Sequence, residues 1–195
     1  ERARILAAFP YLETAGSSKR RGHTLAAHNL RLELRRAFPG VKFSVTSSSF
    51  SGGNSVSVRW EDGPTPKAVE AITERYQAGT FNGWDDSYTY RSGVGRVWGE
   101  VFGSTRWAHP DNRDYSDAAY SWAVSQLLAQ WASPEDAIPE WTPAQVRRGL
   151  FNSVRIHRAG EYLGTLIHRL LYQTDAAAWA SPAEPGVMPA AWAID

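Results

Sequence analysis

Hydrophobic and polar residues alternate over two short segments, 41–46 and 55–60. The apolar positions are Val41, Phe43 and Val45 in the first segment, then Val56, Val58 and Trp60 in the second. A period of two residues is typical of strands that bury one face, so both segments are predicted strands. Between them, residues 47–55 read SSSFSGGNS, which predicts a long loop of hydroxyl side chains with a glycine joint.

Three other segments repeat their apolar residues at the three- and four-residue spacing of a helix. They are 24–38, 66–77 and 116–132. Thr65 and Ser116 supply N-terminal capping side chains, and a proline follows Thr65 at the first helical position. A Pro-Gly pair directly after the first segment ends that helix.

The remaining segments have weaker patterns. Residues 81–90, FNGWDDSYTY, predict a turn-rich connection, and residues 96–108, RVWGEVFGSTRWA, predict a third strand or a hairpin. Residues 153–168 fit either one long helix or a hairpin that turns at Gly160. Glycines in and beside this segment would each cost a helix about 1 kcal/mol relative to alanine, which favours the hairpin.

The order of these elements is α-β-β-α-β-α, followed by a smaller α-β-β or helical unit. This order predicts an α+β fold, in which a small antiparallel sheet carries helices mainly on one face. Four parts follow along the chain: an N-terminal helix with a basic linker over 1–22, the α+β domain over 23–132, the small C-terminal unit over 141–180, and a proline-rich tail over 181–195.

Composition narrows the class of protein. Hydrophobic residues make up 43% of the 195 residues, which is enough for a core, and no apolar run approaches the roughly 18 residues of a membrane span. The N-terminal segment has the pattern of neither a secretory signal nor an anchor, so we expect a cytoplasmic location and no membrane partner. The absence of cysteine excludes disulfides, thiolate zinc sites and cysteine nucleophiles.

Charge is distributed unevenly although the net charge is only +1. Residues 1–42 hold nine Lys or Arg and three acidic residues, whereas residues 61–140 hold six Lys or Arg and thirteen acidic residues. Basic side chains gather in two groups: Lys19, Arg20, Arg21, Arg31, Arg35 and Arg36, then Arg147 and Arg148 with two more arginines nearby. Such groups are candidate contacts for nucleic acid or for an acidic partner protein.

The serine-rich loop is the first candidate site. The residues predicted to bind a partner are Ser49, Phe50, Ser51, Gly52, Gly53 and Asn54. Phe50 is too apolar for a solvated loop without a role, and its small neighbours would let a partner surface approach closely. A structural bulge and an anion cradle of backbone N–H groups remain alternatives. A phosphate-binding loop of the G-x-x-x-x-G-K-[ST] type is excluded, because that pattern is missing.

No catalytic or metal-binding arrangement emerges from the sequence. Asp85 and Asp86 are adjacent, and adjacent residues of a strand face opposite sides. His157, Glu161 and His168 have helical spacing, but the hairpin interpretation separates them and no H-E-x-x-H pattern is present. We therefore expect no metal, no cofactor and no catalytic residues.

Three phrases carry a family resemblance. AFPGVKFSV, VSVRWEDGPT and RYQAGTFNGWDDSYTY occur in this order over residues 37–90. In their order and spacing they resemble the large polyvalent-protein-associated domain numbered twenty-nine in its series, with a similarity that spans about Leu25 to Trp107. Members more often have a smaller apolar residue where this chain has Trp84.

The resemblance implies an origin in phages, plasmids or other conjugative elements, and a role in protecting mobile DNA from restriction or CRISPR systems of the host. No catalytic residues define the family. We therefore expect, first, a non-catalytic interaction protein in the host cytoplasm that counters a host defence complex by binding it. The second expectation is a nucleic-acid-binding accessory protein that protects incoming DNA, and the third is a hydrolase of unknown substrate.

Overall fold

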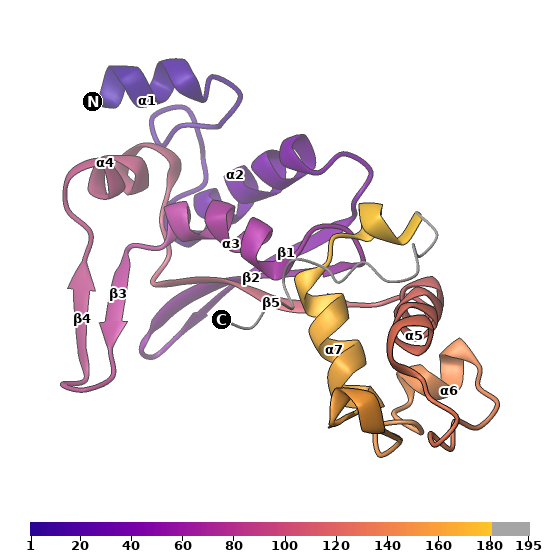
Figure 1. The fold of residues 1–195 in the computed structure, drawn as a ribbon. Helices are drawn as coiled ribbons and strands as arrows, with labels where there is room; N and C mark the ends of the chain where they lie inside the picture. The colour runs from indigo at the N-terminus through magenta and orange to yellow at the C-terminus, as the bar shows by residue number, and fades with distance from the viewer. Residues whose placement is uncertain (181–195) are drawn as a thin grey trace. The chain divides into compact units, whose positions relative to one another are not determined.

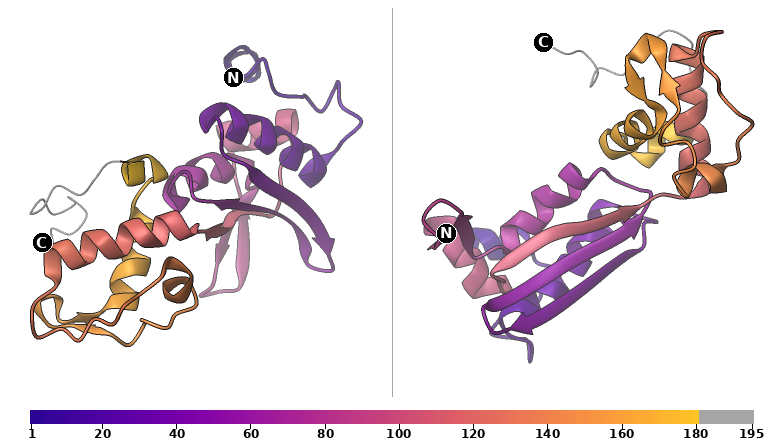
Figure 2. Two further views of the ribbon diagram at one scale, coloured as in Figure 1. Left: turned by 90° about the vertical axis from the view of Figure 1, so that its right-hand side faces the viewer. Right: turned by 90° about the horizontal axis from the view of Figure 1, so that it is seen from below.

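The computed structural model describes residues 1–180, and the proline-rich tail expected over 181–195 lies outside the described residues. The chain divides into two compact units (Figure 1, Figure 2). The first comprises Glu1–Glu61 and Pro66–Arg113, and the second comprises Asp62–Thr65 and the chain from Asp114 onward. Within residues 1–180, no helix is both long and apolar enough to cross a bilayer.

The helices and strands fall in the following order. In the first part of the chain they are α1 (Arg2–Ala8), α2 (Gly22–Ala37), β1 (Phe43–Phe50), β2 (Gly53–Glu61), α3 (Pro66–Thr73), the 3-10 turn η1 (Glu74–Tyr76), β3 (Gly79–Asn82), β4 (Ser87–Tyr90), α4 (Gly93–Phe102) and β5 (Trp107–Asp114). They continue with α5 (Asp117–Trp131), α6 (Pro143–Arg147), β6 (Arg155–Ile156), η2 (His157–Ala159), β7 (Glu161–Tyr162), α7 (Leu163–Gln173) and η3 (Ala176–Ala180).

Strands β1 and β2 form a long antiparallel hairpin that stays paired up to its tip. The pairing runs from Phe43 opposite Trp60 to Phe50 opposite Gly53. The prediction of a long loop over 47–55 is therefore wrong, because only two residues, Ser51 and Gly52, separate the strands. Strand pairing uses backbone N–H and C=O groups, which serine leaves available, so the serines extend the hairpin instead of interrupting it.

The face of this hairpin that points away from the helices carries mainly hydroxyl side chains. Opposite one another across β1 and β2 stand Ser44 and Arg59, Thr46 and Ser57, and Ser48 and Ser55. The other face is apolar and buried, with Val45, Val56, Val58 and Trp60 in the core. Helices α2 and α3 cover that face (Figure 1). The sheet thus has helices on one face, as predicted from the alternating pattern.

Strand β5 completes the sheet next to β2, in the order β1-β2-β5. The Asn54 side chain bonds the backbone of Arg106, and Arg59 bonds Asp111, with a separation of 52 residues in both pairs. A constant separation means that β2 and β5 run in the same direction, so the sheet is mixed. The fold class is α+β, as predicted, but the expectation of a wholly antiparallel sheet is wrong, and the segment from α3 to α4 forms the crossover that a parallel pair requires.

The prediction of a third strand or hairpin over 96–108 is wrong. Most of this segment is helix α4, which buries Trp98, Val101 and Phe102 along one side. These residues have helical spacing, but intervening glycines such as Gly99 weaken the helical signal of the sequence. The third strand of the sheet begins only where this helix and a short connection have ended, with β5.

The second unit packs its helices around a core of its own. Helix α5, which the sequence groups with the domain over 23–132, belongs to this unit, because Ala119 and Leu127 share a core with Leu166 of α7. The segment 153–168 contains parts of both predicted alternatives. The two-residue strands β6 and β7 pair as a minimal hairpin, and α7 follows directly.

A buried polar side chain, Asn29 of α2, fastens three segments of the first unit to one another. Its Oδ1 accepts from the Glu13 N–H at 2.9 Å, and its Nδ2 donates to the carbonyls of Glu13 at 2.8 Å and Phe102 at 2.9 Å. Beside Phe102, Gly103 has a φ of +87°, and a Cβ there would lie 2.6 Å from the Gly22 carbonyl oxygen. The end of α4 thus approaches α2 as closely as glycine allows.

We expect Asn29→Asp to lower the free energy of unfolding by about 3 kcal/mol or more at pH 7. The carboxylate has nearly the same shape but no donor, so it would face two carbonyl oxygens as a buried charge. The loss should shrink under acidic conditions, because the protonated acid regains one donor. Urea denaturation at pH 7 and at pH 4 measures both effects.

Asn82→Asp is the matched control, since the exposed Asn82 side chain accepts a bond from the Trp84 N–H and a carboxylate can do the same. This change should alter the free energy of unfolding by less than about 0.5 kcal/mol. Equal losses for the two variants would contradict the role given to the Asn29 amide.

Candidate functional site

The residues predicted to bind a partner form the tip of the β1–β2 hairpin. Phe50 is 50% exposed, and its ring lies against Gly52. Asn54, predicted to belong to a partner-binding loop, makes bonds within the protein. Its Oδ1 accepts from the Thr105 hydroxyl and from the Arg106 N–H, both at 2.8 Å. The side chain of Asn54 therefore holds the tip to the segment that leads into β5, and leaves Phe50 as its exposed apolar group.

Arg106 connects this tip to the second hairpin of the unit. Its Nη1 donates to the Gly52 carbonyl at 3.0 Å, and its guanidinium lies 4.7 Å from the centroid of the Tyr88 ring. The Tyr88 hydroxyl in turn donates to the Arg106 carbonyl at 2.7 Å. At Gly53, a Cβ would lie 2.7 Å from Cδ of Arg106, so glycine gives this side chain its space. No sequence pattern indicates this role of Arg106, because its contacts join residues far apart in the chain.

The segment expected to be only a turn-rich connection forms the β3–β4 hairpin. Phe81 stands opposite Tyr88, and both rings lie 5.6 Å from the ring of Trp107 in edge-on geometry. Tyr90 adds a further edge-on contact with Tyr88 at 5.0 Å. Phe81 and Tyr90 remain 39% and 68% exposed. Ring contacts with Trp107 and Tyr88 hold one side of the cluster, and its other side faces solvent.

Trp84 lies at the turn of this hairpin and is 99% exposed. The turn is held at both ends, since the Trp84 N–H bonds the Asn82 side chain and the Ser87 N–H bonds the Asp85 side chain, each at 3.1 Å. Hydrogen bonding by Ser87 lowers the pKa of Asp85, and Asp86 takes a left-handed φ of +55°. The turn therefore presents a large apolar side chain on a well-defined backbone, directly before two acidic residues.

The exposed aromatic side chains of the two hairpins are grouped below under the name two-hairpin surface: Phe50, Phe81, Trp84 and Tyr90. Figure 1 shows the turns of the two hairpins directed to the same side of the first unit. Sequence reasoning identified Phe50 but missed the other three residues. The available signal was a large aromatic residue inside a run of turn-forming residues, at Trp84.

The predicted basic groups have mostly structural partners. In the first group, Arg20 pairs with Glu13, Arg21 bonds the Ser18 carbonyl, Arg31 bonds the Val45 carbonyl, and Arg36 lies over the Tyr11 ring. Lys19 and Arg35 are exposed. In the second unit Arg147 pairs with Asp117, and Arg148 is exposed. Most of these cations thus connect helix α2 to the N-terminal segment and to β1, or sit in a surface ion pair, rather than forming one open patch.

The candidate metal ligands also have other partners. His157 bonds Asp136 through Nδ1 at 2.8 Å, and hydrogen bonds from the backbone and ring of His157 hold the pKa of Asp136 well below its usual range. Glu161 pairs with Arg169 at 2.6 Å, and His168 is exposed on α7. Over the part of the chain that the structure describes, no three His, Asp or Glu side chains are grouped as metal ligands.

Comparison with known families matches the α+β part of the chain. Residues 22–116 match the family model described as large polyvalent protein associated domain 29, a stretch that runs from the start of α2 to the end of β5. The chain therefore carries a domain of this family, as the phrases over 37–90 predict. The family is associated with the polyvalent proteins of mobile elements. No curated protein and no solved structure matches the chain.

Because Arg106 links the two hairpins, we expect Arg106→Leu to loosen the tip of the β1–β2 hairpin without unfolding the sheet. Amide hydrogen exchange over residues 50–53 should accelerate about tenfold or more, since a bond from a charged donor and a ring contact are lost. Amides near Val45 and Val58 should keep their protection. Arg96→Leu is the control, because within the described residues Arg96 pairs only with Glu100, on the exposed side of α4. Unchanged exchange at the tip would contradict the linking role.

Proposed function

We propose that this chain is a non-catalytic interaction protein of a mobile genetic element, which counters a host defence system by binding one of its protein components. The two-hairpin surface is the proposed contact. The observation that carries this proposal is Trp84, whose indole is 99% exposed at the end of a turn that is hydrogen-bonded at both ends.

An exposed tryptophan on a fixed turn is suited to anchoring a protein partner. Its burial removes a large apolar area from water, and such anchors contribute about 2 kcal/mol or more at an interface. Since side-chain bonds already fix the turn, little backbone freedom is lost on binding. Phe50 and Tyr90 extend the apolar area, and edge-on contacts with Trp107 and Tyr88 support the cluster from behind.

The charge around Trp84 favours a protein over a nucleic acid. Asp85 and Asp86 follow Trp84 directly and are exposed, so they would repel the phosphates of a strand stacked on the indole. A pocket with an apolar floor and a basic rim on a defence protein would complement this arrangement. The partner on this proposal is a protein component of a restriction or CRISPR system. The match to a family of polyvalent-protein domains associated with mobile elements supports this choice.

We expect Trp84→Ala and Phe50→Ala each to reduce protection of the mobile element by at least about tenfold, while the melting temperature changes little. A plaque or conjugation assay measures protection in hosts with and without the defence system. The physical reason is the loss of an interface anchor that touches little of the protein's own core.

Two controls accompany this test. Tyr162→Ala removes an exposed aromatic residue from the second unit and should leave protection unchanged. Leu34→Ala empties a fully buried core position and should cost about 2–5 kcal/mol of stability. Full protection by Trp84→Ala, or a loss of stability as large as that of Leu34→Ala, would contradict the proposal.

A nucleic-acid partner remains open to a direct test. On our proposal, a mobility-shift assay near physiological salt shows no retention of duplex or single-stranded DNA at micromolar protein. Retention that falls steeply with salt, and that Lys19→Glu with Arg35→Glu weakens equally for all sequences, would instead support the accessory protein that protects incoming DNA. These two cations are chosen because they are exposed and have no ion pair within residues 1–180.

A further inference from the structure

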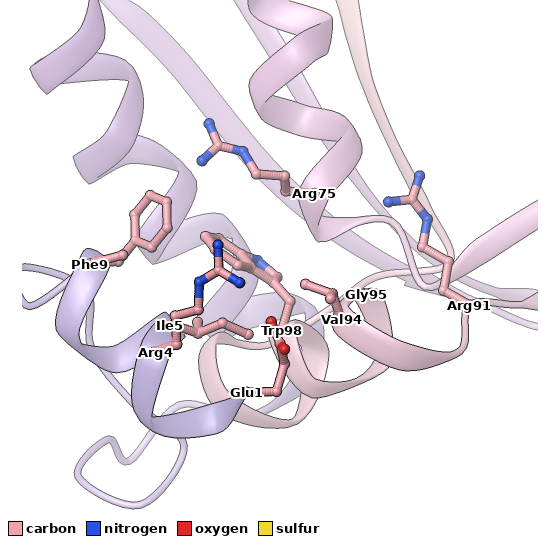
Figure 3. A pocket seen from close by; sticks show the side chains of 10 residues that line it. Glu1, Arg4, Ile5, Phe9, Arg75, Arg91, Val94, Gly95 and Trp98 are labelled. Atoms are coloured by element: carbon pink, nitrogen blue, oxygen red, sulfur yellow. The ribbon is translucent and has the colours of Figure 1, made fainter.

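A pocket of about 580 Å³ lies within the first unit, between α1 and α4. Its walls include Arg4 and Phe9 from the N-terminal segment, Arg75 from η1, Arg91 before α4, and Val94 and Trp98 from α4. Figure 3 shows the three arginine side chains, which come from three different segments, around the same opening. The volume falls in the range of small-molecule sites, roughly 300–1,000 Å³. None of these residues belongs to the two-hairpin surface.

Arg75 forms a cationic platform in this pocket. Its guanidinium lies 5.5 Å from the ring centroids of both Phe9 and Trp98. Its Nη1 bonds Oε1 of Glu33 at 2.9 Å, and burial raises the pKa of that carboxyl. Because the two rings and the buried carboxylate hold the guanidinium plane in place, a planar ligand can stack on it without first ordering the side chain.

Arg4 and Arg91 supply donors beside this platform. Arg91 shares one nitrogen with Glu74 at 2.8 Å, which leaves most of its five N–H groups available. Arg4 has no ion pair with any residue of the described part of the chain. Three arginines and one acidic residue, Glu1, line the pocket, and two of the arginines are paired with Glu33 and Glu74 outside the lining, so Arg4 is the main uncompensated cation. Guanidinium groups bind phosphate and carboxylate oxygens with two parallel hydrogen bonds.

The floor of the pocket contains an unsatisfied donor. Trp98 is only 5% exposed, and its indole Nε1 is buried without a hydrogen-bond partner within residues 1–180. Because this N–H is closed off from solvent, Trp98 offers the pocket its apolar ring, and the donors available to a ligand are those of the arginines. The pocket thus combines an apolar floor, aromatic rings, a planar cation and spare donors.

We propose that this pocket binds a small organic anion of the nucleoside phosphate class. The ring stacks on Arg75 and lies against Val94, and the phosphate is bound by Arg4 and Arg91. This assignment rests on the pocket alone and does not depend on the proposed anti-defence function.

Isothermal titration calorimetry of the full chain with the four common nucleoside 5′-monophosphates tests the proposal. Adenosine supplies the ring without the charge, and inorganic phosphate supplies the charge without the ring. We expect at least one monophosphate to bind at least tenfold more tightly than either fragment. Arg4→Glu and Val94→Asp should each weaken that binding at least tenfold.

Arg2→Glu is the matched control, because it makes the same change of charge on the same helix outside the pocket lining. It should change the affinity by less than about threefold, since salt screens charges that do not touch the ligand. Three results would overturn the proposal: no binding of any monophosphate at millimolar concentration, equal affinity for inorganic phosphate alone, or equal losses for Arg2→Glu and Arg4→Glu. Protection of the mobile element by the Arg4→Glu variant separates a failure here from a failure of the proposed function.

Discussion

The arrangement of the first unit depends on two buried polar side chains that lie one helical turn apart on α2. Asn29 binds the backbone at Glu13 and Phe102, and Glu33 binds Arg75. Through these bonds the N-terminal segment, the end of α4 and η1 are all attached to the same helix. Apolar packing alone would allow such short elements to slide, because it has no direction, whereas each of these bonds has one required geometry. Both attachments therefore help to hold α1, α4 and η1, the elements around the pocket, in their positions.

Arg106 holds the two hairpins of the first unit together, as Asn29 and Glu33 hold its helices. A tip that projects beyond the core has few apolar contacts of its own, so its order depends on a few directed bonds. Asn54 and Arg106 supply these bonds. The Asn54 side chain accepts from the Arg106 N–H just before β5, and the Arg106 side chain donates to the Gly52 carbonyl at the tip. The same guanidinium packs on Tyr88 and so orients the β3–β4 hairpin. One side chain thereby sets the relative position of the two hairpins, as a preformed binding surface requires.

The sequence predicted the elements whose signals are local. Period-two alternation located β1 and β2, helical spacing located α2, α3 and α5, and three phrases identified the family. Prediction from the sequence failed for elements whose formation depends on contacts between residues far apart in the chain. Helix α4 was hidden by its glycines, one of which, Gly103 at its end, is required by the approach of α2. The content of serine and glycine over 47–55 predicts a loop, whereas the backbone of this segment continues the hairpin, with Ser48 opposite Ser55 and Phe50 opposite Gly53. Neither Arg106 nor the pocket has a signature in the sequence, since both are made by the tertiary fold.

The serine-rich strand and the exposed aromatic residues follow from one constraint. A hairpin that extends past its covering helices has two wet faces, and apolar residues along it would make an open edge prone to pairing with other chains. Short hydroxyl side chains avoid this, because they keep the backbone pairing and remain solvated. Against such a background, the apolar side chains at the two tips, Phe50 and Trp84, are exceptions, and Trp84 in particular buries almost none of its area in the unit. Both residues lie at hairpin turns held by side-chain hydrogen bonds, which is the placement that the proposed contact with another molecule requires.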